Sequence, residues 1–399
     1  MYKLYCRLYQ LTFRFIARFL PWRQPQLLEG ENSLGKLPSL IKTKGLDTVL
    51  IVTDNGIVSL GLMNDLQKGL EAEGVEYFVY DRTVANPTIE NIEEALKMYH
   101  SNHCQGIIAF GGGSPMDCAK GVSARVARPD KSIQQMKGQL KIRKRLPPLF
   151  AIPTTAGTGS EATLAAVISN TKTHEKYALN DPVLIPHVAV LDPLLTINLP
   201  PHITSTTGMD ALTHAIEAYI GKSNTAETKQ HSREAVTLIF ENLYEAYANG
   251  QNIEARRNMQ KASYLAGMAF TRAYVGYVHA IAHTLGGFYA TPHGLANAII
   301  LPYVLEYYGK SVHKTLAELA DLVGIGTSQD SDKQKAEAFI QAIKQLNAQM
   351  DIPNKADGIV ETDILVMVER ALNEANPLYP VPRILSKKDL LHLYHIIKI

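Results

Sequence analysis

Short apolar runs alternate with helical patterns between residues 46 and 192. Five short runs rich in β-branched, aromatic and other apolar residues are typical of buried strands, and they cover 49–54, 77–81, 106–110, 149–153 and 188–192. Alternating strands and helices predict a mostly parallel sheet. Residues 163–179, between the fourth and fifth runs, predict an inserted hairpin with its turn at Asn170 to Thr173. The basic, proline-ended stretch 138–148 predicts a solvated loop without a function.

Strand patterns end near residue 200, and long helical patterns follow, such as 227–249, which stops at Gly250. A chain of 399 residues exceeds the usual size of one core. We therefore predict an α/β N-terminal dinucleotide-binding lobe at 29–195, with a mostly parallel sheet and an inserted hairpin, and an all-α C-terminal lobe at 196–399.

The first 28 residues form a separate predicted element. All charges there are basic, at Lys3, Arg7, Arg14, Arg18 and Arg23, and no acidic residue precedes Glu29. Their spacing predicts an amphipathic helix. Arg14 and Arg18 interrupt any run long enough to cross a bilayer, and no cleavage site follows, so a membrane span and a secretion signal are both excluded. Two interpretations remain open for residues 1–23: packing on a neighbouring subunit, which implies a homo-oligomer of two or more chains, and contact with a membrane surface.

The composition is that of an ordinary globular protein. Hydrophobic residues make up 46% and charged residues 20%, and the formal net charge is +2. This balance excludes a general attraction to nucleic acid and favours small-molecule partners. The three cysteines, Cys6, Cys104 and Cys118, are widely spaced and form no CxxC, so a disulfide framework and a thiolate metal site are not expected. A cytoplasmic protein, with peripheral membrane contact as an option, fits best.

Two glycine-rich loops are candidates for binding phosphate. The run at 106–110 leads directly into Gly111, Gly112, Gly113 and Ser114, where a strand ends and a helix begins. There the backbone can approach a diphosphate and offer helix N-terminal amides, although a ligand-free tight turn would also use glycine. The second loop, 153–161, follows the next strand and offers the hydroxyl groups of Thr154, Thr155 and Thr158.

Asp54 ends an earlier strand. A carboxylate in this position can accept bonds from ribose hydroxyls and repel a 2′-phosphate, which favours NAD over NADP. The competing interpretation is an N-cap for the helix that follows.

A carboxylate and four imidazoles in the second half of the chain are candidates for an open metal site. Asp210 and His214 are four residues apart, as are His279 and His283, so each pair shares a helix face, and His293 follows. A lone histidine is more often structural, but five such groups together favour a site. Without cysteine, the ligand chemistry allows Fe(II), Zn(II) or another divalent ion.

From about Leu27 to the C-terminus the chain resembles the iron-dependent, or group III, alcohol dehydrogenases, which include lactaldehyde reductase and the propanediol oxidoreductases. The resemblance is carried by GGGSPMDCAK, PTTAGTGSE, LDPLLTINLPPHITSTTGMDALTHAIE and VHAIAHTLGGFYATPHGLANAIILP. It implies a metal bound by Asp210, His214, His279 and His293, with Fe(II) favoured, and an unligated His283 beside the substrate and nicotinamide. It also implies NAD contacts from Asp54, Asn86, Gly112, Gly113, Ser114, Thr154, Thr155, Thr158 and Lys176.

Three departures from the family pattern limit what the resemblance implies: Ser205 directly before TTGMDAL, where the family usually has a small aliphatic residue, Thr271 with Arg272 before His279, and the N-terminal segment. The expected function is reversible hydride transfer between a primary alcohol or aldehyde and NAD, with His283 relaying the hydroxyl proton. The alternatives are a zinc polyol (glycerol-type) dehydrogenase on the same fold, and an assembly or membrane-associated binding protein with a residual catalytic core.

Overall fold

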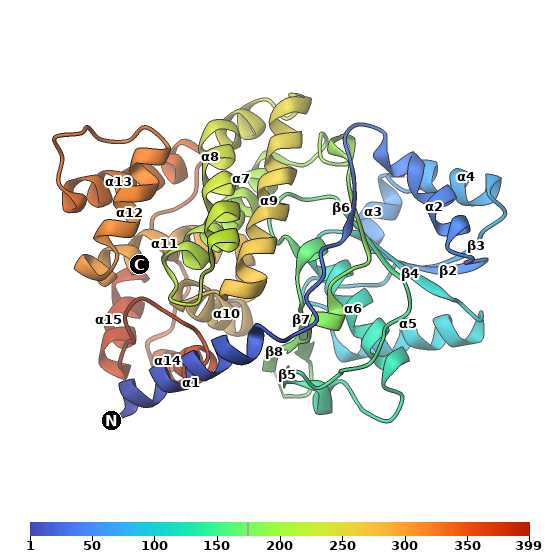
Figure 1. The fold of residues 1–399 in the computed structure, drawn as a ribbon, viewed down its shortest axis with the longest axis horizontal. Coiled ribbons are helices and arrows are strands. Elements are labelled where there is room, and N and C mark those ends of the chain that lie inside the picture. The colour runs from blue at the N-terminus through green and yellow to red at the C-terminus, as the bar shows by residue number, and fades with distance from the viewer. Residues whose placement is uncertain (174) are drawn as a thin grey trace. The chain divides into compact units, whose positions relative to one another are not determined.

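The computed structural model describes residues 1–173 and 175–399 (Figure 1). Its contacts divide the chain into two units, Pro21–Asn198 and a helical unit made of Met1–Leu20 with Leu199–Ile399. The N-terminal helix therefore belongs to the helical unit. The predicted limits of 1–28, 29–195 and 196–399 stay a proposal for how the chain divides into independently folding parts.

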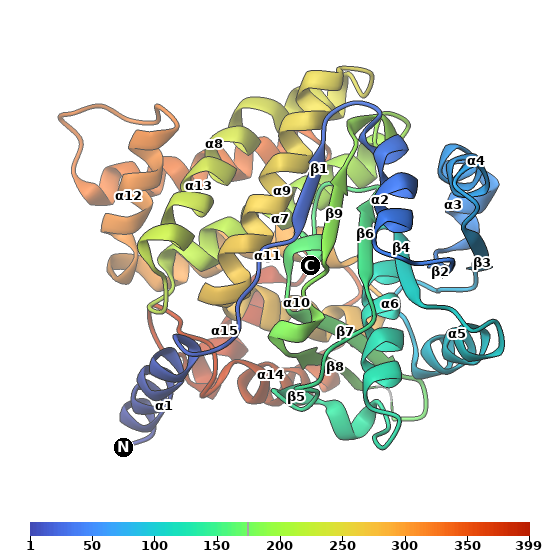
Figure 2. The same cartoon turned by 45° about the vertical axis from the view of Figure 1, so that its right-hand side comes forward.

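The unit Pro21–Asn198 is built on a six-stranded sheet in the order β1-β9-β6-β4-β2-β3, visible in Figure 2. Every pairing in this sheet is parallel. The strands are β1 (Gln26–Glu29), β2 (Thr48–Val52), β3 (Glu76–Tyr80), β4 (Gly106–Gly111), β6 (Leu149–Pro153) and β9 (Val188–Leu191). β3 lies on one side of β2 and β4 on the other, so the strand order reverses between β2 and β4. Ligands of open α/β sheets bind at the carboxyl ends of strands at such a point.

The alternation of side chains along the strands places a hydrophobic core on each face of this sheet. On β2, Leu50 and Val52 belong to one core and Val49 and Ile51 to the other. The first core is completed by α5 (Ile89–Ser101) and α6 (Gly113–Ala127), and the second by α2 (Leu37–Thr43) and α4 (Asn64–Ala72). The short α3 (Asn55–Ser59) follows β2 directly. Burial on both faces explains why these strands read as continuous apolar runs in the sequence.

The five predicted strands and the predicted hairpin are confirmed. The hairpin consists of β7 (Ala165–Asn170) and β8 (Glu175–Asn180), which pair antiparallel; residue 174 of the predicted segment lies outside the described residues. Strand β1 was not predicted, because its four residues, QLLE, have polar ends and no extended apolar run.

The predicted solvated loop at 138–148 is confirmed for most of its length, because residues 140–148 contain no helix or strand and residues 141 and 143–145 are exposed. Its first two residues form β5 (Gly138–Gln139), which joins β8 and β7 in a separate three-stranded sheet. Asp181 then anchors the segment, because its Oδ2 atom accepts the backbone N–H groups of Ile142, at 3.1 Å, and Arg143, at 2.9 Å. Tertiary hydrogen bonds decide the conformation here, and they leave no signal in a basic stretch of sequence.

The described residues of the helical unit form helices and loops, with no strand and one isolated bridge, between Ala356 and Lys398. Helix α7 (Pro201–Ile220) is buried along most of its length, because its sequence is apolar on nearly all sides. The others are α1 (Tyr2–Ala17), α8 (Ala226–Ala248), α9 (Ile253–Ala273), α10 (Tyr277–Tyr289), α11 (His293–Tyr308), α12 (His313–Leu322), α13 (Asp332–Gln349), α14 (Glu361–Ala375) and α15 (Lys387–Ile397). None of the described helices is both long and apolar enough to span a membrane.

Candidate metal centre and cofactor site

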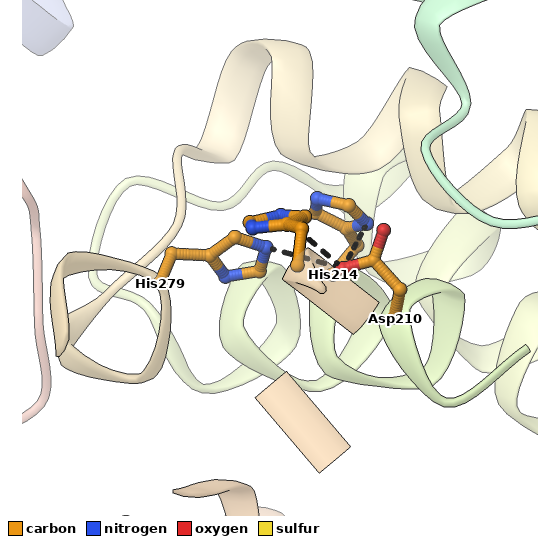
Figure 3. Close-up of side chains that lie close together, drawn as sticks. Asp210, His214 and His279 are labelled. Carbon is orange, nitrogen blue, oxygen red and sulfur yellow. Dashed lines mark ion pairs between the residues drawn. The ribbon is translucent and has the colours of Figure 1, made fainter. Parts of the chain in front are cut away.

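Three helices of the helical unit bring one carboxylate and three imidazoles together (Figure 3). Asp210 and His214 lie one turn apart on α7, His279 lies in the first turn of α10, and His293 is the first residue of α11. One potential ligand atom from each of these residues lies within 4.8 Å of all the others. The structure thus places the four predicted ligands in one cluster, and their role as metal ligands stays a prediction.

The spacing of these atoms fits a divalent ion. Oδ1 of Asp210 lies 4.0 Å from Nδ1 of His214, 3.8 Å from Nε2 of His279 and 3.5 Å from Nε2 of His293. Two metal–ligand bonds of about 2.0–2.2 Å add up to roughly 4.2 Å, so one ion can contact Asp210 and each histidine without a large movement. Asp210, His214 and His279 are buried. Burying a carboxylate among imidazoles is costly unless it is compensated, and a cation would compensate it.

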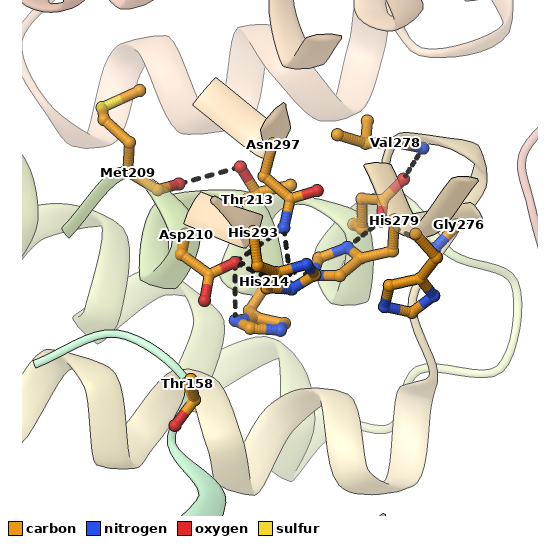
Figure 4. Close-up of polar contacts among 12 residues, drawn as sticks. Thr158, Met209, Asp210, Thr213, His214, Gly276, Val278, His279, His293 and Asn297 are labelled. Atoms are coloured by element: carbon orange, nitrogen blue, oxygen red, sulfur yellow. Dashed lines mark hydrogen bonds and ion pairs between the residues drawn. The ribbon is translucent and has the colours of Figure 1, made fainter. Parts of the chain in front are cut away.

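Glu217 orients one of the histidines. Its Oε2 atom lies 2.7 Å from Nδ1 of His279, and both residues are buried. Its two oxygens also accept the backbone N–H groups of Gly276, at 2.7 Å, and Val278, at 2.9 Å (Figure 4). Because the carboxylate holds the proton on Nδ1, the lone pair of Nε2 is left for a metal. That Nε2 atom has no hydrogen-bond partner among the described residues.

Asn297 and Phe270 complete the surroundings of the cluster. Nδ2 of Asn297 donates to Oδ1 of Asp210 at 2.6 Å and lies 3.2 Å from Nε2 of His293, its neighbour one turn earlier on α11 (Figure 4). The ring of Phe270 stacks on His214 with the ring centroids 4.1 Å apart. The amide fixes the carboxylate and the phenyl ring fixes the imidazole plane, so the cluster is held by its neighbours.

His283 lies beside this cluster and outside the four-residue set. Its ring stacks on that of His293, with centroids 5.1 Å apart. Nδ1 of His283 lies 2.7 Å from Oε1 of Glu374 on α14, and the hydroxyl of Tyr379 donates to the same oxygen at 2.9 Å. The carboxylate holds a proton on Nδ1, so Nε2 is free to accept one. This arrangement suits a group that relays a proton.

In the other unit, the two predicted phosphate-binding loops contact each other. Helix α6 begins at the glycine loop with Gly112 as its N-cap, and no side chain caps its first amides. A Cβ atom added to Gly113 would lie 2.8 Å from Cγ2 of Thr158, and one added to Gly112 would lie 3.5 Å from Thr155. Backbone donors and threonine hydroxyls therefore lie next to each other at a helix N-terminus, as an anion site requires.

Asp54, Asn86, Ser114 and Lys176 extend this edge of the sheet. Nζ of Lys176 on β8 donates to Oδ1 of Asn86 at 2.8 Å, and the backbone N–H of Asn86 donates to Oγ of Ser114 at 3.2 Å. Asp54 is the N-cap of α3, where its Oδ1 accepts the N–H of Ile57 at 3.0 Å. The capping interpretation of Asp54 is thus confirmed, and its contact with a ribose stays a prediction.

The buried side chain of Lys120 on α6 stabilises the second loop, 153–161, through hydrogen bonds. Nζ of Lys120 donates to Oγ of Ser160, at 2.9 Å, and to the carbonyls of Thr163, at 2.9 Å, and Ala165, at 2.8 Å. Oδ1 of Asp117 accepts from the same Ser160 hydroxyl at 3.1 Å. Burial lowers the pKa of Lys120 to about 8. These bonds join α6 to the segment that carries Thr154, Thr155 and Thr158, and so they position the loop.

Several of these supporting residues were not predicted from the sequence. Glu217 and Asn297 had a detectable signal, because Glu217 follows Asp210 by seven residues on the same helix and Asn297 follows His293 by four. Glu374 had none, since 91 residues separate it from His283. Arg272, one of the departures from the family pattern, forms a 2.5 Å ion pair with Glu227 of α8. Ser205 donates to the carbonyl of His202 within α7, so its departure from the family pattern is accommodated locally.

Comparison with known proteins identifies the relatives of this chain. Residues 25–193 match the family model described as iron-containing alcohol dehydrogenase, and residues 204–397 match the model for the C-terminal part of the Fe-containing alcohol dehydrogenase family. The chain is 38% identical to 1,3-propanediol dehydrogenase of Citrobacter freundii over 369 residues, covering 92% of this chain and 95% of that one.

Two further similarities agree with these family matches. The chain is 41% identical to alcohol dehydrogenase 4 of Saccharomyces cerevisiae (strain YJM789) over 350 residues, covering 87% of this chain and 90% of the relative. Its structure is similar to a crystal structure of 1,3-propanediol oxidoreductase, with a TM-score of 0.91 and 36% identity over 95% of this chain and all of the other (100%).

Proposed function

Because the chain belongs to the iron-containing alcohol dehydrogenase family, we propose that it transfers a hydride reversibly between a primary alcohol or aldehyde and NAD with the help of a divalent metal. Family membership confirms the resemblance read from the sequence. It also favours an alcohol dehydrogenase over the polyol dehydrogenase and the non-catalytic binding protein considered as alternatives.

One observation carries the proposal: Asp210, His214, His279 and His293 converge within 4.8 Å of one another, and Glu217 leaves a lone pair of His279 directed at the cluster. We propose these four residues as the metal ligands. An ion bound there would supply Lewis-acid activation of the substrate oxygen. Fe(II) is our first choice because of the family, and Zn(II) is the alternative that the ligand chemistry equally accepts.

The cofactor is proposed to bind the other unit at the carboxyl ends of β2, β4 and β6. The N-terminal amides of α6 would bind the diphosphate, supported by Gly112, Gly113, Ser114, Thr154, Thr155 and Thr158. Asp54 would accept bonds from a ribose, and Asn86 with Lys176 would form the polar wall next to it. The negative charge of Asp54 disfavours a 2′-phosphate, so NAD is the proposed nucleotide.

The proton of the alcohol needs an acceptor, and His283 is the proposed relay. Glu374 fixes the ring so that Nε2 can take the proton directly or through a water or ribose hydroxyl. In the reduction direction the same atom would return the proton to the oxygen that forms. His283 is thus the proposed catalytic residue, and Glu374 a positioning residue.

The test combines elemental analysis with a substrate panel. The purified protein is stripped with a chelator, reloaded anaerobically with Fe(II) or Zn(II), and assayed by NADH absorbance with short and long primary alcohols, diols and their aldehydes. The His279→Ala variant should lose both the metal and turnover, whereas Arg272→Ala, outside the cluster, should keep both. Turnover that persists without metal, or no turnover with any metal and substrate, would refute the proposed function.

We keep two further expectations as proposals. A reducing, cytoplasmic location is supported by three free and buried cysteines. A homo-oligomer is expected from the sequence argument alone, and sedimentation equilibrium that found only the 44.0 kDa mass of one chain would contradict it.

A further inference from the structure

One side of helix α1 is fixed to the helical unit. The guanidinium of Arg7 donates to the carbonyls of Val381, at 2.8 Å, and Pro382, at 3.0 Å. Nε2 of Gln10 donates to the carbonyls of Pro377, at 3.0 Å, and Tyr379, at 2.8 Å. Cys6 and Gln10 are buried. Hydrogen bonds from two side chains three residues apart define the docked side, so α1 is held in a fixed orientation on this unit.

The opposite side of α1 is apolar and exposed. At about 100° per residue, its large apolar side chains occupy one continuous half of the helix circumference, interrupted only by Thr12. They are between 36% and 74% exposed: Tyr2, Leu4, Tyr5, Leu8, Tyr9, Leu11, Phe15 and Ile16, with Phe19 just beyond the helix. We call this set the apolar face of α1. Folded proteins rarely expose so large a contiguous patch without a partner for it.

The charges around this face indicate the kind of partner. On the same helical projection Arg18 borders one edge of the apolar face, and Tyr2, Tyr5 and Tyr9 line the other. Lys3 and Arg14 lie on the docked side, where Arg14 donates to the carbonyls of Lys222 and Asn224. No acidic residue occurs before Glu29. Basic residues beside an apolar face that is rich in aromatic rings are the pattern of helices that lie in the interface of an anionic membrane. A second copy fits less well, because its identical face would offer no acidic residue to pair with Arg18.

We propose that α1 attaches this protein to the surface of an anionic lipid membrane. The hydrogen bonds of Arg7 and Gln10 keep the docked side on the protein, and the apolar face enters the boundary between headgroups and acyl chains. Arg18, at the edge of this face, contacts the anionic headgroups. Because the helix is held on the protein along its length, it lies in the plane of the membrane. The proposal is independent of the metal and cofactor sites, so it stands or falls separately from the proposed function.

The test is co-sedimentation of the full-length protein with vesicles of phosphatidylcholine alone or mixed with phosphatidylglycerol. We expect binding to the mixed vesicles that weakens as salt is raised. The Leu8→Glu/Phe15→Glu variant should lose binding by at least tenfold while keeping its turnover. Leu365→Glu/Val366→Glu, which adds the same charge at two exposed residues of α14, should bind like the unmodified protein. Arg18→Gln should weaken binding to the mixed vesicles by about fivefold, whereas Lys3→Gln, on the docked side of the helix, should weaken it less.

Several results would overturn the proposal. Absence of binding to mixed vesicles, or equal binding by Leu8→Glu/Phe15→Glu, excludes the apolar face as a membrane site. Equal binding to both kinds of vesicle excludes the contact between Arg18 and anionic headgroups. If the unmodified protein does not bind vesicles but Leu8→Glu/Phe15→Glu sediments as a smaller species, the face belongs to a second copy of the chain.

Discussion

Nδ1 of His279 lies 2.7 Å from Oε2 of Glu217, and the same carboxylate accepts the backbone N–H groups of Gly276 and Val278. One side chain therefore fixes both the start of α10 and the orientation of a proposed metal ligand. A Glu217→Gln variant keeps the shape but loses the charge that makes Nε2 a stronger donor. We expect the metal affinity to fall by about 10- to 100-fold.

A competition titration with a chromophoric chelator measures this change. Glu234→Gln is the matched control, because it removes a surface carboxylate that pairs only with Lys261 in the described structure. Unchanged metal affinity in Glu217→Gln would show that the carboxylate serves only to hold α10.

His283 is expected to affect turnover without affecting the metal. His283→Ala should bind metal normally, because His283 lies outside the ligand cluster, and should lose roughly 10²- to 10⁴-fold in kcat, the usual contribution of a general acid or base. Kinetics with elemental analysis of the same sample separates the two effects. Full turnover of His283→Ala across the accessible pH range would reject the relay.

Glu374 provides a graded version of this experiment. Glu374→Gln should lower kcat less than His283→Ala does, because the ring stays but is less firmly oriented. Tyr379→Phe removes only the hydroxyl that donates to Glu374 and should have the smallest effect. An order of effects other than this one would contradict positioning by Glu374.

Much of the metal cluster could be predicted from the sequence, because its information is local. The i, i+4 spacing of Asp210 and His214 on an apolar stretch determines that both side chains leave the same face of one helix. The residues that orient the cluster were harder to find. Glu374 contacts His283 only because α14 packs on α10. Packing between helices far apart in the chain produces no periodic pattern in the sequence.

The strands also differ in whether the sequence predicts them. Buried parallel strands such as 106–110 form apolar runs, so the sheet could be predicted. Strand β1 is short and not buried at either end, and it pairs in parallel with β9, about 160 residues later. The two-residue β5 depends in the same way on β8. Edge strands without an apolar run therefore form because a neighbouring strand pairs with them, and their own sequence does not predict them.

Asp54 should discriminate between the two nicotinamide dinucleotides. Asp54→Asn keeps an acceptor for the N–H of Ile57 but removes the negative charge, so we expect the preference for NAD over NADP to fall by roughly tenfold. Asp54→Ala should also lose about 1 kcal/mol of stability, because the cap of α3 is gone. Comparing kcat/KM for both nucleotides with thermal unfolding of both variants tests this. An unchanged preference for NAD over NADP in Asp54→Asn would show that Asp54 only caps α3.

Gly113 should tolerate no side chain. In Gly113→Ala the new Cβ would lie 2.8 Å from Cγ2 of Thr158, so the loop would have to move away from the N-terminus of α6. We expect NADH affinity, measured by fluorescence titration, to fall by roughly tenfold or more, which is about 1.4 kcal/mol or more. Gly35→Ala is the control, because a Cβ there meets nothing within 4 Å. Equal NADH affinity in both variants would contradict the proposed diphosphate site at the N-terminus of α6.

Glu161 should make stability depend on pH. Burial raises its pKa from 4.5 to about 7, so the folded protein binds a proton that the unfolded chain releases between these values. Stability from this group is fully present below pH 4.5 and is lost as the pH rises through about 7. We expect the unfolding free energy to fall by up to about 3 kcal/mol across that window.

Urea unfolding at several pH values measures this slope. In Glu161→Gln the decrease should disappear, whereas Glu73→Gln, an exposed site, should retain it. The same slope in Glu161→Gln as in the unmodified protein would assign the effect to another group.

The three thiols of this chain are buried, and burial raises the pKa of Cys104 to about 11 and that of Cys118 to about 12. Thiolates are the species that react with maleimides, so the native protein should offer labelling reagents almost no background. A single cysteine introduced at an outward position such as Leu8 would then carry the only fluorophore on the molecule. Emission from that probe could report the depth of α1 in a bilayer while the enzyme turns over.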